Sequence, residues 1–218
     1  NPTTSSVVYS SPIAVAQTTT IRAIAVKAGL AQSAVAAGTF TINIPPGTTE
    51  PVTFNPAAGT YPNTLNVGLS TATPGATICF TVDDSAPACT AGVCQGTSAT
   101  YNGANPVPVN ASGTKIRAIA CKAGNNPSGE LSSTYNFKAA AATANPAPGI
   151  VPSSTQVTLS TATTGGVIHY TMNGAAPTCL TGSTITDTGL TPPITTNTTI
   201  RTIVCRAGFA DSDPATFD

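Results

Sequence analysis

The sequence predicts an all-β protein made of tandem immunoglobulin-like β-sandwiches that are stapled by disulfides. First, a segment of the type Ile-Arg-x-Ile, followed by Lys/Arg-Ala-Gly, occurs three times and starts at Ile21, Ile116 and Ile200. The copies lie roughly 85 to 95 residues apart, a period that fits one whole β-domain per repeat. Second, the chain alternates short apolar and polar runs with clusters of Gly, Pro, Asn and Asp, which is typical of strands joined by turns.

Third, the chain contains six cysteines, enough for three disulfides, and only 7% of its residues are charged. Eight basic and eight acidic side chains provide no basic stripe for nucleic acid and no polybasic cluster for anionic lipid. No run of about 18 apolar residues predicts a membrane-spanning helix. Apolar residues at helical spacing are also lacking, apart from the short Ala-rich run at residues 138–144, which we interpret as a linker.

The second repeat shows the expected strands most completely. Residues 53–59 open it, and residues 65–73 and 76–82 follow, each alternating apolar with small polar side chains as a half-buried strand does. Asp83-Asp84 then form a turn. The segment Pro106-Val107-Pro108-Val109 fits an edge strand, because proline has no N–H to donate to a neighbour.

The Ile-Arg segment comes next along the chain. Both faces of this segment carry apolar residues, which predicts a central strand. We expect the side chains of Arg22, Arg117 and Arg201 to point outward and to pair with a neighbouring strand. The alternative is that the three repeated arginines form a ladder that binds a ligand. Each repeat closes with a last strand, at residues 38–42, 133–137 or 215–217. About seven strands per repeat indicate an immunoglobulin-like sandwich.

The self-alignment divides the chain into residues 1–43, 44–138 and 139–218. Asn1 aligns with Ala86, so residues 1–43 correspond to the C-terminal half of a repeat. Half a sandwich cannot bury its inner face alone. We expect the missing strands to come from another subunit, through strand addition that would build a filament, or from the same parent chain. The joins are expected at residues 43–47 and 138–144.

The six cysteines also follow the repeats. Cys89 aligns with Cys179 and Cys121 with Cys205, while the first repeat lacks both members. This predicts the bridges Cys89–Cys121 and Cys179–Cys205, and elimination leaves Cys79–Cys94. Such bridges indicate an oxidising, extracellular compartment. Zinc binding is the alternative for the cysteines, but the spacings are unlike those of paired zinc ligands.

Residues 75–87 (Gly-Ala-Thr-Ile-Cys-Phe-Thr-Val-Asp-Asp-Ser-Ala-Pro) and 114–124 (Thr-Lys-Ile-Arg-Ala-Ile-Ala-Cys-Lys-Ala-Gly) resemble the chitobiase/β-hexosaminidase C-terminal-type repeat. This is an immunoglobulin-like, fibronectin-associated module of bacterial secreted and surface proteins. The resemblance covers nearly the whole chain and implies a structural or accessory module without catalytic residues. The third repeat departs from the pattern with Asn173-Gly174-Ala175 where the family has an Asp-Gly-Ser turn.

Candidate chemistry is sparse, so we expect no enzyme, no catalytic, cofactor-binding or metal residues, and no cofactor. His169 is the single histidine and is interpreted as a strand residue rather than a general base. Asp83-Asp84 and the pair Asp211 and Asp213 are turn residues, with calcium between modules as the alternative. Aromatic residues that occupy equivalent positions in two repeats are interpreted as core residues. Tyr61 has no aromatic counterpart, so it is left as a candidate sugar-binding platform.

Two sequons, at Asn110 and Asn197, precede the Ile-Arg strands at equivalent loops and are possible glycosylation sites. Taken together, these features predict a structural module of an extracellular filament, stalk or adhesin on the cell surface. Its partners would be neighbouring copies of the same protein or a continuation of the same chain, and possibly glycans. The alternative is a spacer or carbohydrate-binding accessory domain of a secreted polysaccharide-active enzyme.

Overall fold

The computed structural model describes residues 1–43 and 45–218. It forms two compact units, Asn1–Pro46 and Gly47–Asp218. The expected join at residues 43–47 includes Ile44, which lies outside the described residues. The described residues form strands, turns and loops with no helix. None of them forms a helix long and apolar enough to cross a membrane.

Unit 1 (residues 1–46) contains one antiparallel pair of strands, β1 (Thr19–Ala23) and β2 (Ala36–Phe40). The register places Ile21 opposite Gly38. The same register recurs in the second repeat, where Ile116 of β11 lies opposite Ser133 of β12. The two strands of unit 1 are therefore the counterparts of the last two strands of a complete repeat.

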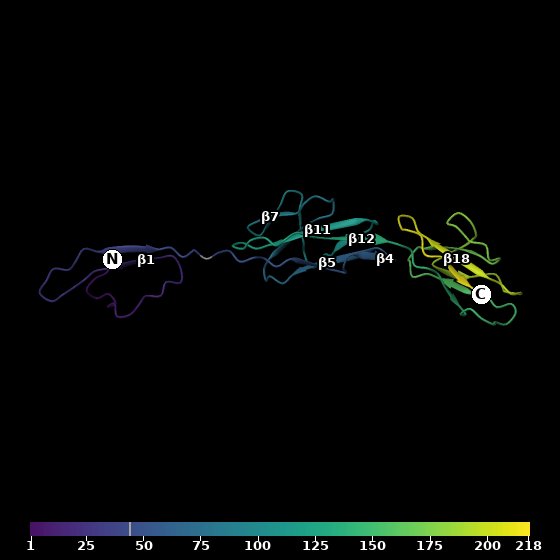
Figure 1. The fold of residues 1–218 in the computed structure, drawn as a ribbon, viewed down its shortest axis with the longest axis horizontal. Coiled ribbons are helices and arrows are strands. Elements are labelled where there is room, and N and C mark those ends of the chain that lie inside the picture. Colours follow the sequence, from purple (N-terminus) through teal and green to yellow (C-terminus); the bar gives the residue numbers. More distant parts are fainter. Residues whose placement is uncertain (44) are drawn as a thin grey trace. The chain divides into compact units, whose positions relative to one another are not determined.

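The second repeat is a sandwich of two sheets. The first has the order β10-β5-β3 and the second β4-β12-β11-β6-β9; Figure 1 labels β5 and β4, β11 and β12. A hairpin of β7 and β8 projects from it. The bounds are β3 Val52–Asn55, β4 Gly59–Tyr61, β5 Leu65–Thr71, β6 Thr77–Thr81, β7 Ala88–Thr90, β8 Val93–Gln95, β9 Ala99–Thr100, β10 Val107–Val109, β11 Thr114–Cys121 and β12 Leu131–Phe137.

The Ile-Arg strand β11 lies between β12 and β6 in that sheet, so the prediction of a central strand is confirmed. Its inward side chains Ile116, Ala118 and Ala120 are fully buried. They face Val67 and Leu69 of β5, in the same core cluster. This alternation explains the sequence pattern, because residues at every second position of a strand point into the space between the sheets.

The third repeat is also a sandwich of two sheets, of order β13-β14-β17 and β16-β15-β18-β19. Leu159, Ile168, Ile200 and Val204 form its core. The bounds are β13 Thr143–Asn145, β14 Thr158–Ser160, β15 Val167–Thr171, β16 Ser183–Thr186, β17 Thr188–Leu190, β18 Ile200–Cys205 and β19 Ala215–Phe217. The fold class predicted from the sequence is confirmed.

The Lys/Arg-Ala-Gly motif forms the turn that leaves the Ile-Arg strand. In the second repeat the N–H of Asn125 donates to the carbonyl of Lys122, at 3.1 Å. Gly124 has φ of +82° at the third position of that turn, as a type II turn requires. The equivalent glycines Gly29 and Gly208 have φ of +81° and +80°, so the repeated glycine has a conformational cause.

A serine follows each of these turns and returns the chain to the sheet. Ser128 Oγ accepts a hydrogen bond from the N–H of Ala120 at 2.9 Å and donates to the carbonyl of Gly129. Ser33 and Ser212 make the same two bonds in the other repeats. Ser128 is buried, whereas Ser33 is exposed. The buried N–H of Ala120 thus depends on Ser128 for its partner.

We predict that Ser128→Ala lowers the free energy of unfolding of unit 2 by about 1–3 kcal/mol, because it leaves the buried Ala120 N–H without an acceptor. Urea unfolding followed by circular dichroism measures the change. Ser33→Ala is the matched control, since it removes the same bonds at an exposed site and leaves the transition of unit 2 in place. Equal losses for the two variants would contradict this explanation.

Candidate functional site

Unit 1 exposes apolar side chains whose counterparts in the second repeat are buried. On the strand face that corresponds to the core face of the second repeat, Phe40 is 53% exposed and Ile42 38% exposed. Their counterparts Tyr135 and Phe137 are 0% and 1% exposed. Ala23 is also exposed and Ile21 only half-buried. We call Ile21, Ala23, Phe40 and Ile42 the uncovered face.

The segment before β1 shows the same difference. Tyr9 is 72% and Ile13 56% exposed, and no strand is assigned between Asn1 and Thr18. In the second repeat Val107, the counterpart of Ile13, is buried because β10 pairs with β5. Unit 1 therefore has residues of core type without the opposing sheet that would cover them.

The prediction that repeat-equivalent aromatic residues belong to the core is confirmed for Tyr135 and Tyr170, which are buried. It is wrong for Tyr9 and Phe40, because strands equivalent to β3–β6 do not cover them within the described part of unit 1. Identical positions in the pattern therefore have different environments, and the difference comes from the packing partner.

Tyr61, the candidate sugar platform, lies in β4 and is half-buried. Its hydroxyl donates to the carbonyl of Ala57 at 2.7 Å, and its ring centroid is 6.2 Å from that of Tyr135. The ring therefore packs on the core cluster of the second repeat. The structure places Tyr61 as a packing residue, so its interpretation as a free aromatic platform is wrong.

The three repeated arginines have structural partners, and Arg117 and Arg201 both donate to the carbonyl of the equivalent turn residue, Asp84 or Gly174. Arg117 makes a two-pronged ion pair with Glu130, with Nε–Oε1 at 2.7 Å and Nη2–Oε2 at 3.0 Å. Arg22 donates to the side-chain oxygen of Asn1, and Arg201 to the carbonyl of Gly174. These contacts support the prediction of structural pairing and not a repeated ligand ladder. The carboxylate of Glu130 also holds the pKa of Arg117 above its ordinary value.

Three of the four acidic residues in the two pairs, Asp83, Asp84 and Asp213, have structural partners. Asp83 accepts from the N–H and hydroxyl of Ser85, which lowers the pKa of its carboxyl. Asp84 lies 2.9 Å from the Lys115 ammonium, whose hydrogen bond and charge lower its pKa. Asp213 pairs with Lys138 at 2.8 Å. These carboxylates serve turns and ion pairs of the fold.

His169 lies in β15 opposite Thr184 and Ile203 of the flanking strands. Its buried Nδ1 has no hydrogen-bond partner among the described residues. No nucleophile or carboxylate is paired with it in the described hydrogen bonds or ion pairs. The arrangement corresponds to a packed strand residue.

The cysteines form three disulfides: Cys79–Cys94, Cys89–Cys121 and Cys179–Cys205. These are the pairs expected from the alignment of the repeats. Two of them tie the Ile-Arg strand to the loop after the third strand, which restricts the unfolded chain. The sulfurs of Cys79, Cys89 and Cys121 lie close together, as do those of Cys179 and Cys205 near the Asp211 carboxylate. All six thiols are consumed in disulfides, and a disulfide sulfur is no thiolate ligand.

The two sequon asparagines, Asn110 and Asn197, are exposed in loops before β11 and β18. Both side chains are therefore accessible to a modifying enzyme. Their glycosylation stays a prediction.

The family model of the chitobiase/β-hexosaminidase C-terminal domain matches residues 1–37, 56–134 and 146–216. The chain belongs to this family. The match occurs once in each of the three repeats, and the family is a non-catalytic C-terminal module. The resemblance read from residues 75–87 and 114–124 is confirmed.

No curated protein matches the chain. Among solved structures, the crystal structure of chicken CNTN1 FN1-FN3 domains is 13% identical, with 90% of this chain and 75% of that chain covered and a TM-score of 0.25. It is a tandem array of fibronectin type III domains.

We predict that Tyr135→Phe removes one tyrosine ionisation above pH 10 from the alkaline titration. Burial raises the pKa of Tyr135 above 10.0. In the unfolded chain the phenol ionises near pH 10. The stability that the neutral Tyr135 phenol contributes to the folded state is therefore fully present below pH 10 and is lost as pH rises toward the raised pKa. Absorbance at 295 nm of wild type minus variant should show one transition above pH 10.

The same variant should lose about 1 kcal/mol of unfolding free energy at neutral pH, because the hydroxyl donates to the Pro56 carbonyl at 2.9 Å. Tyr9→Phe, at an exposed ring, is the control. A difference transition centred at or below pH 10 would contradict the burial argument.

Proposed function

We propose that this protein is a structural module of an extracellular filament, stalk or adhesin, in which a neighbouring subunit completes unit 1. The observation that carries the proposal is the uncovered face. It has the residue types and strand register of a sandwich core, yet Phe40 is 53% exposed where Tyr135 is fully buried.

Burial of apolar side chains favours the association of unit 1 with a covering sheet. Covering an exposed Phe or Ile side chain contributes about 1.5–3 kcal/mol, so Phe40, Ile42 and Ile13 together provide a substantial drive for association. Strand addition also provides backbone hydrogen bonds along a free edge. Each subunit that completes the next one through different surfaces generates an open chain of subunits, and so a fibre.

The occupant that fits is a sheet of the type that β3 and β5 form in the second repeat. In that repeat the sheet covers Ile116, Tyr135 and Phe137 and pairs β5 with β10. A second copy of the chain is the source to which we commit, and continuation of the same polypeptide is the other outcome of the test.

The compact repeats of unit 2 suit such a role. Phe137, at the end of the second repeat, stacks on Phe209 of the third with ring centroids 4.8 Å apart. Lys138 forms a parallel bridge with Ala210 and an ion pair with Asp213. These contacts fix one repeat on the next, as a load-bearing shaft requires. The three disulfides support an extracellular location.

The direct test is negative-stain electron microscopy of the native material. We expect long fibres with a regular axial repeat. Separate, beaded particles that remain short at every concentration would contradict the filament and would favour an accessory part of a larger secreted protein.

A second prediction concerns stability. A peptide of residues 1–43 should show no cooperative thermal transition, because its core residues lack a covering sheet. Circular dichroism during heating measures this, with residues 47–218 as the control that melts cooperatively. A cooperative melt of the peptide would show that unit 1 needs no partner.

A further inference from the structure

Two fully buried cysteines lie on the outer face of the β11 sheet in the second repeat. Cys79 of β6 is 0% exposed and Cys121 of β11 is 1% exposed. Their neighbours along the strands, Ile78 and Ala120, belong to the core between the sheets, so the two cysteines point to the opposite face. There β7 contacts β11 and β8 contacts β6. The hairpin therefore covers both sulfurs.

The hairpin brings two more cysteines to the same place. Cys89 of β7 lies directly opposite Cys94 of β8, and side chains of opposed residues extend from the same face of a strand pair. Both reach the sheet, where they are bonded to the two buried cysteines. We call these four residues the cysteine cluster: Cys79, Cys89, Cys94 and Cys121.

The sulfurs of the cysteine cluster are close to the spacing of a zinc site. The Sγ atoms of Cys79, Cys89 and Cys121 all lie within 4.8 Å of one another, and that of Cys94 is bonded to Cys79. Tetrahedral Zn²⁺ with Zn–S bonds of about 2.3 Å holds its sulfurs roughly 3.8 Å apart. Each pair of bonded sulfurs therefore has to separate by only about 1.7 Å to reach this geometry.

The third repeat lacks this arrangement. Its disulfide, Cys179–Cys205, has only the carboxylate of the exposed Asp211 beside it among the described residues. His169 lies at the place of Cys79 in the sheet, yet it does not belong to this group. The third repeat thus provides a natural comparison, with two sulfurs where the second repeat has four.

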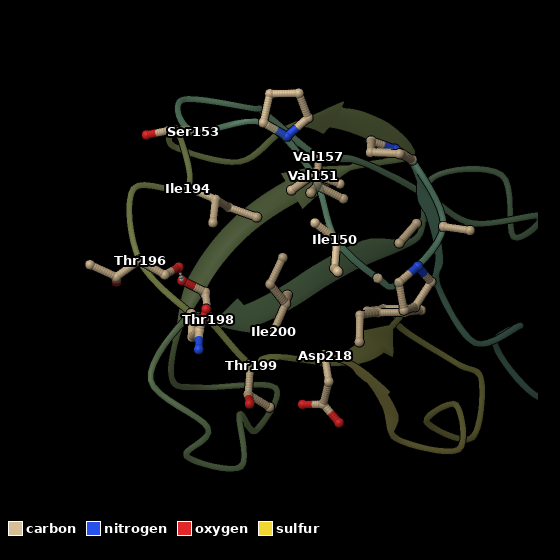
Figure 2. Close-up of a pocket in the computed structure, with 18 of the residues that line it drawn as sticks. Ile150, Val151, Ser153, Val157, Ile194, Thr196, Thr198, Thr199, Ile200 and Asp218 are labelled. Atoms are coloured by element: carbon tan, nitrogen blue, oxygen red, sulfur yellow. Dashed lines mark hydrogen bonds between the residues drawn. The ribbon is translucent and has the colours of Figure 1, made fainter.

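The cavity of the third repeat is a different kind of site. Figure 2 shows Ile194, Ile200 and Val151 around this space of about 560 Å³. Asp218 is the one charged side chain among the lining residues, which include no cysteine and no histidine. The cavity therefore lacks the sulfur and nitrogen ligands that zinc prefers.

We propose that the cysteine cluster is a tetrahedral Zn²⁺ site in the reduced protein, so that zinc replaces two disulfides as the tie between the β7–β8 hairpin and the sheet. Four sulfur ligands leave no open coordination position, which makes the site structural and not catalytic. Thiolate ligands also select zinc over the harder Mg²⁺ and Ca²⁺. The inference does not depend on the filament or on what covers unit 1.

The redox state of the cluster decides whether it binds metal. A dithiol reductant gives two electrons and two protons to each disulfide, yields two thiols, and closes into its own disulfide. Zn²⁺ then displaces the protons of the four thiols, and the complex has a net charge of −2. A disulfide oxidant takes the electrons back, restores both bridges and releases the zinc, because a disulfide sulfur is no thiolate.

The core of the second repeat does not include the cluster. Its side chains, such as Val67, Ile116 and Phe137, lie between the two sheets. We therefore expect the reduced repeat to keep its sandwich, while the hairpin is held by zinc alone.

The first experiment titrates the full chain, reduced with a phosphine under argon, with Co²⁺ as a spectroscopic probe. We expect the charge-transfer and d–d bands of a tetrahedral cobalt thiolate, saturating at one Co²⁺ per chain and lost when Zn²⁺ displaces the cobalt. The oxidised chain is the control and should give no such bands. Absence of the bands in the reduced chain would overturn the proposal.

Two double variants locate the site. Cys79→Ser with Cys94→Ser should weaken Zn²⁺ binding by at least roughly a hundredfold, because two of four ligands are lost. Cys179→Ser with Cys205→Ser is the matched control, since it also removes one disulfide and should leave the affinity unchanged. Equal affinities of the two variants would show that the ligands are not those of the cluster.

Two readouts on the wild-type chain do not depend on a variant folding. Zinc should protect the cysteine cluster from alkylation by iodoacetamide in the reduced chain, whereas Cys179 and Cys205 should react, as mass spectrometry of the digest measures. Zinc should also slow hydrogen exchange of the amides of residues 88–95, because it fixes the hairpin. Equal alkylation of all six cysteines, or zinc binding without slower exchange of the hairpin, would contradict the proposed site.

Discussion

Burial of the inward side chains of the Ile-Arg strand is the interaction on which each repeat depends. Ile116, Ala118 and Ala120 are fully buried because a second sheet covers them. The turn glycine and the serine that follows it only direct the chain back to this sheet. Where the covering sheet is lacking, as at Ala23, the same sequence leaves its apolar residues in solvent.

Because each repeat depends on a covering sheet, unit 1 leaves apolar side chains exposed to solvent. The uncovered face of unit 1 has a final strand without a complete sandwich. The uncovered face is recognised by comparison with the second repeat, where Tyr135 and Phe137 are buried. In the third repeat, a cavity of about 560 Å³ lies beside β19.

The contacts between the second and third repeats show how a family of accessory modules can produce a firm joint. Phe137 belongs to the core of one repeat and stacks on Phe209 of the next. Asn63 bonds the backbone of Ala162 and Thr164 across the same boundary. Before the second repeat, the carbonyl of Gly47 accepts the corresponding backbone bond from Asn126, but Gly47 has no ring to stack. The joint in unit 2 is therefore stabilised by a side chain that repetition of the backbone pattern alone does not provide.

The sequence by itself determined the all-β class, the three repeats and the central place of the Ile-Arg strand, because strand alternation and turn residues such as Gly124 act locally. It also indicated the pairs of cysteines, since residues equivalent by alignment occupy equivalent positions. Only the tertiary structure decided which apolar residues are covered. Tyr61 and Tyr9 differ in exposure because one packs on Tyr135 and the other faces no sheet. The register of β19 against β18, which places Phe217 opposite Ile200, was likewise not predicted by the sequence. That register depends on contacts between distant segments, and a pattern read along the chain carries no information about them.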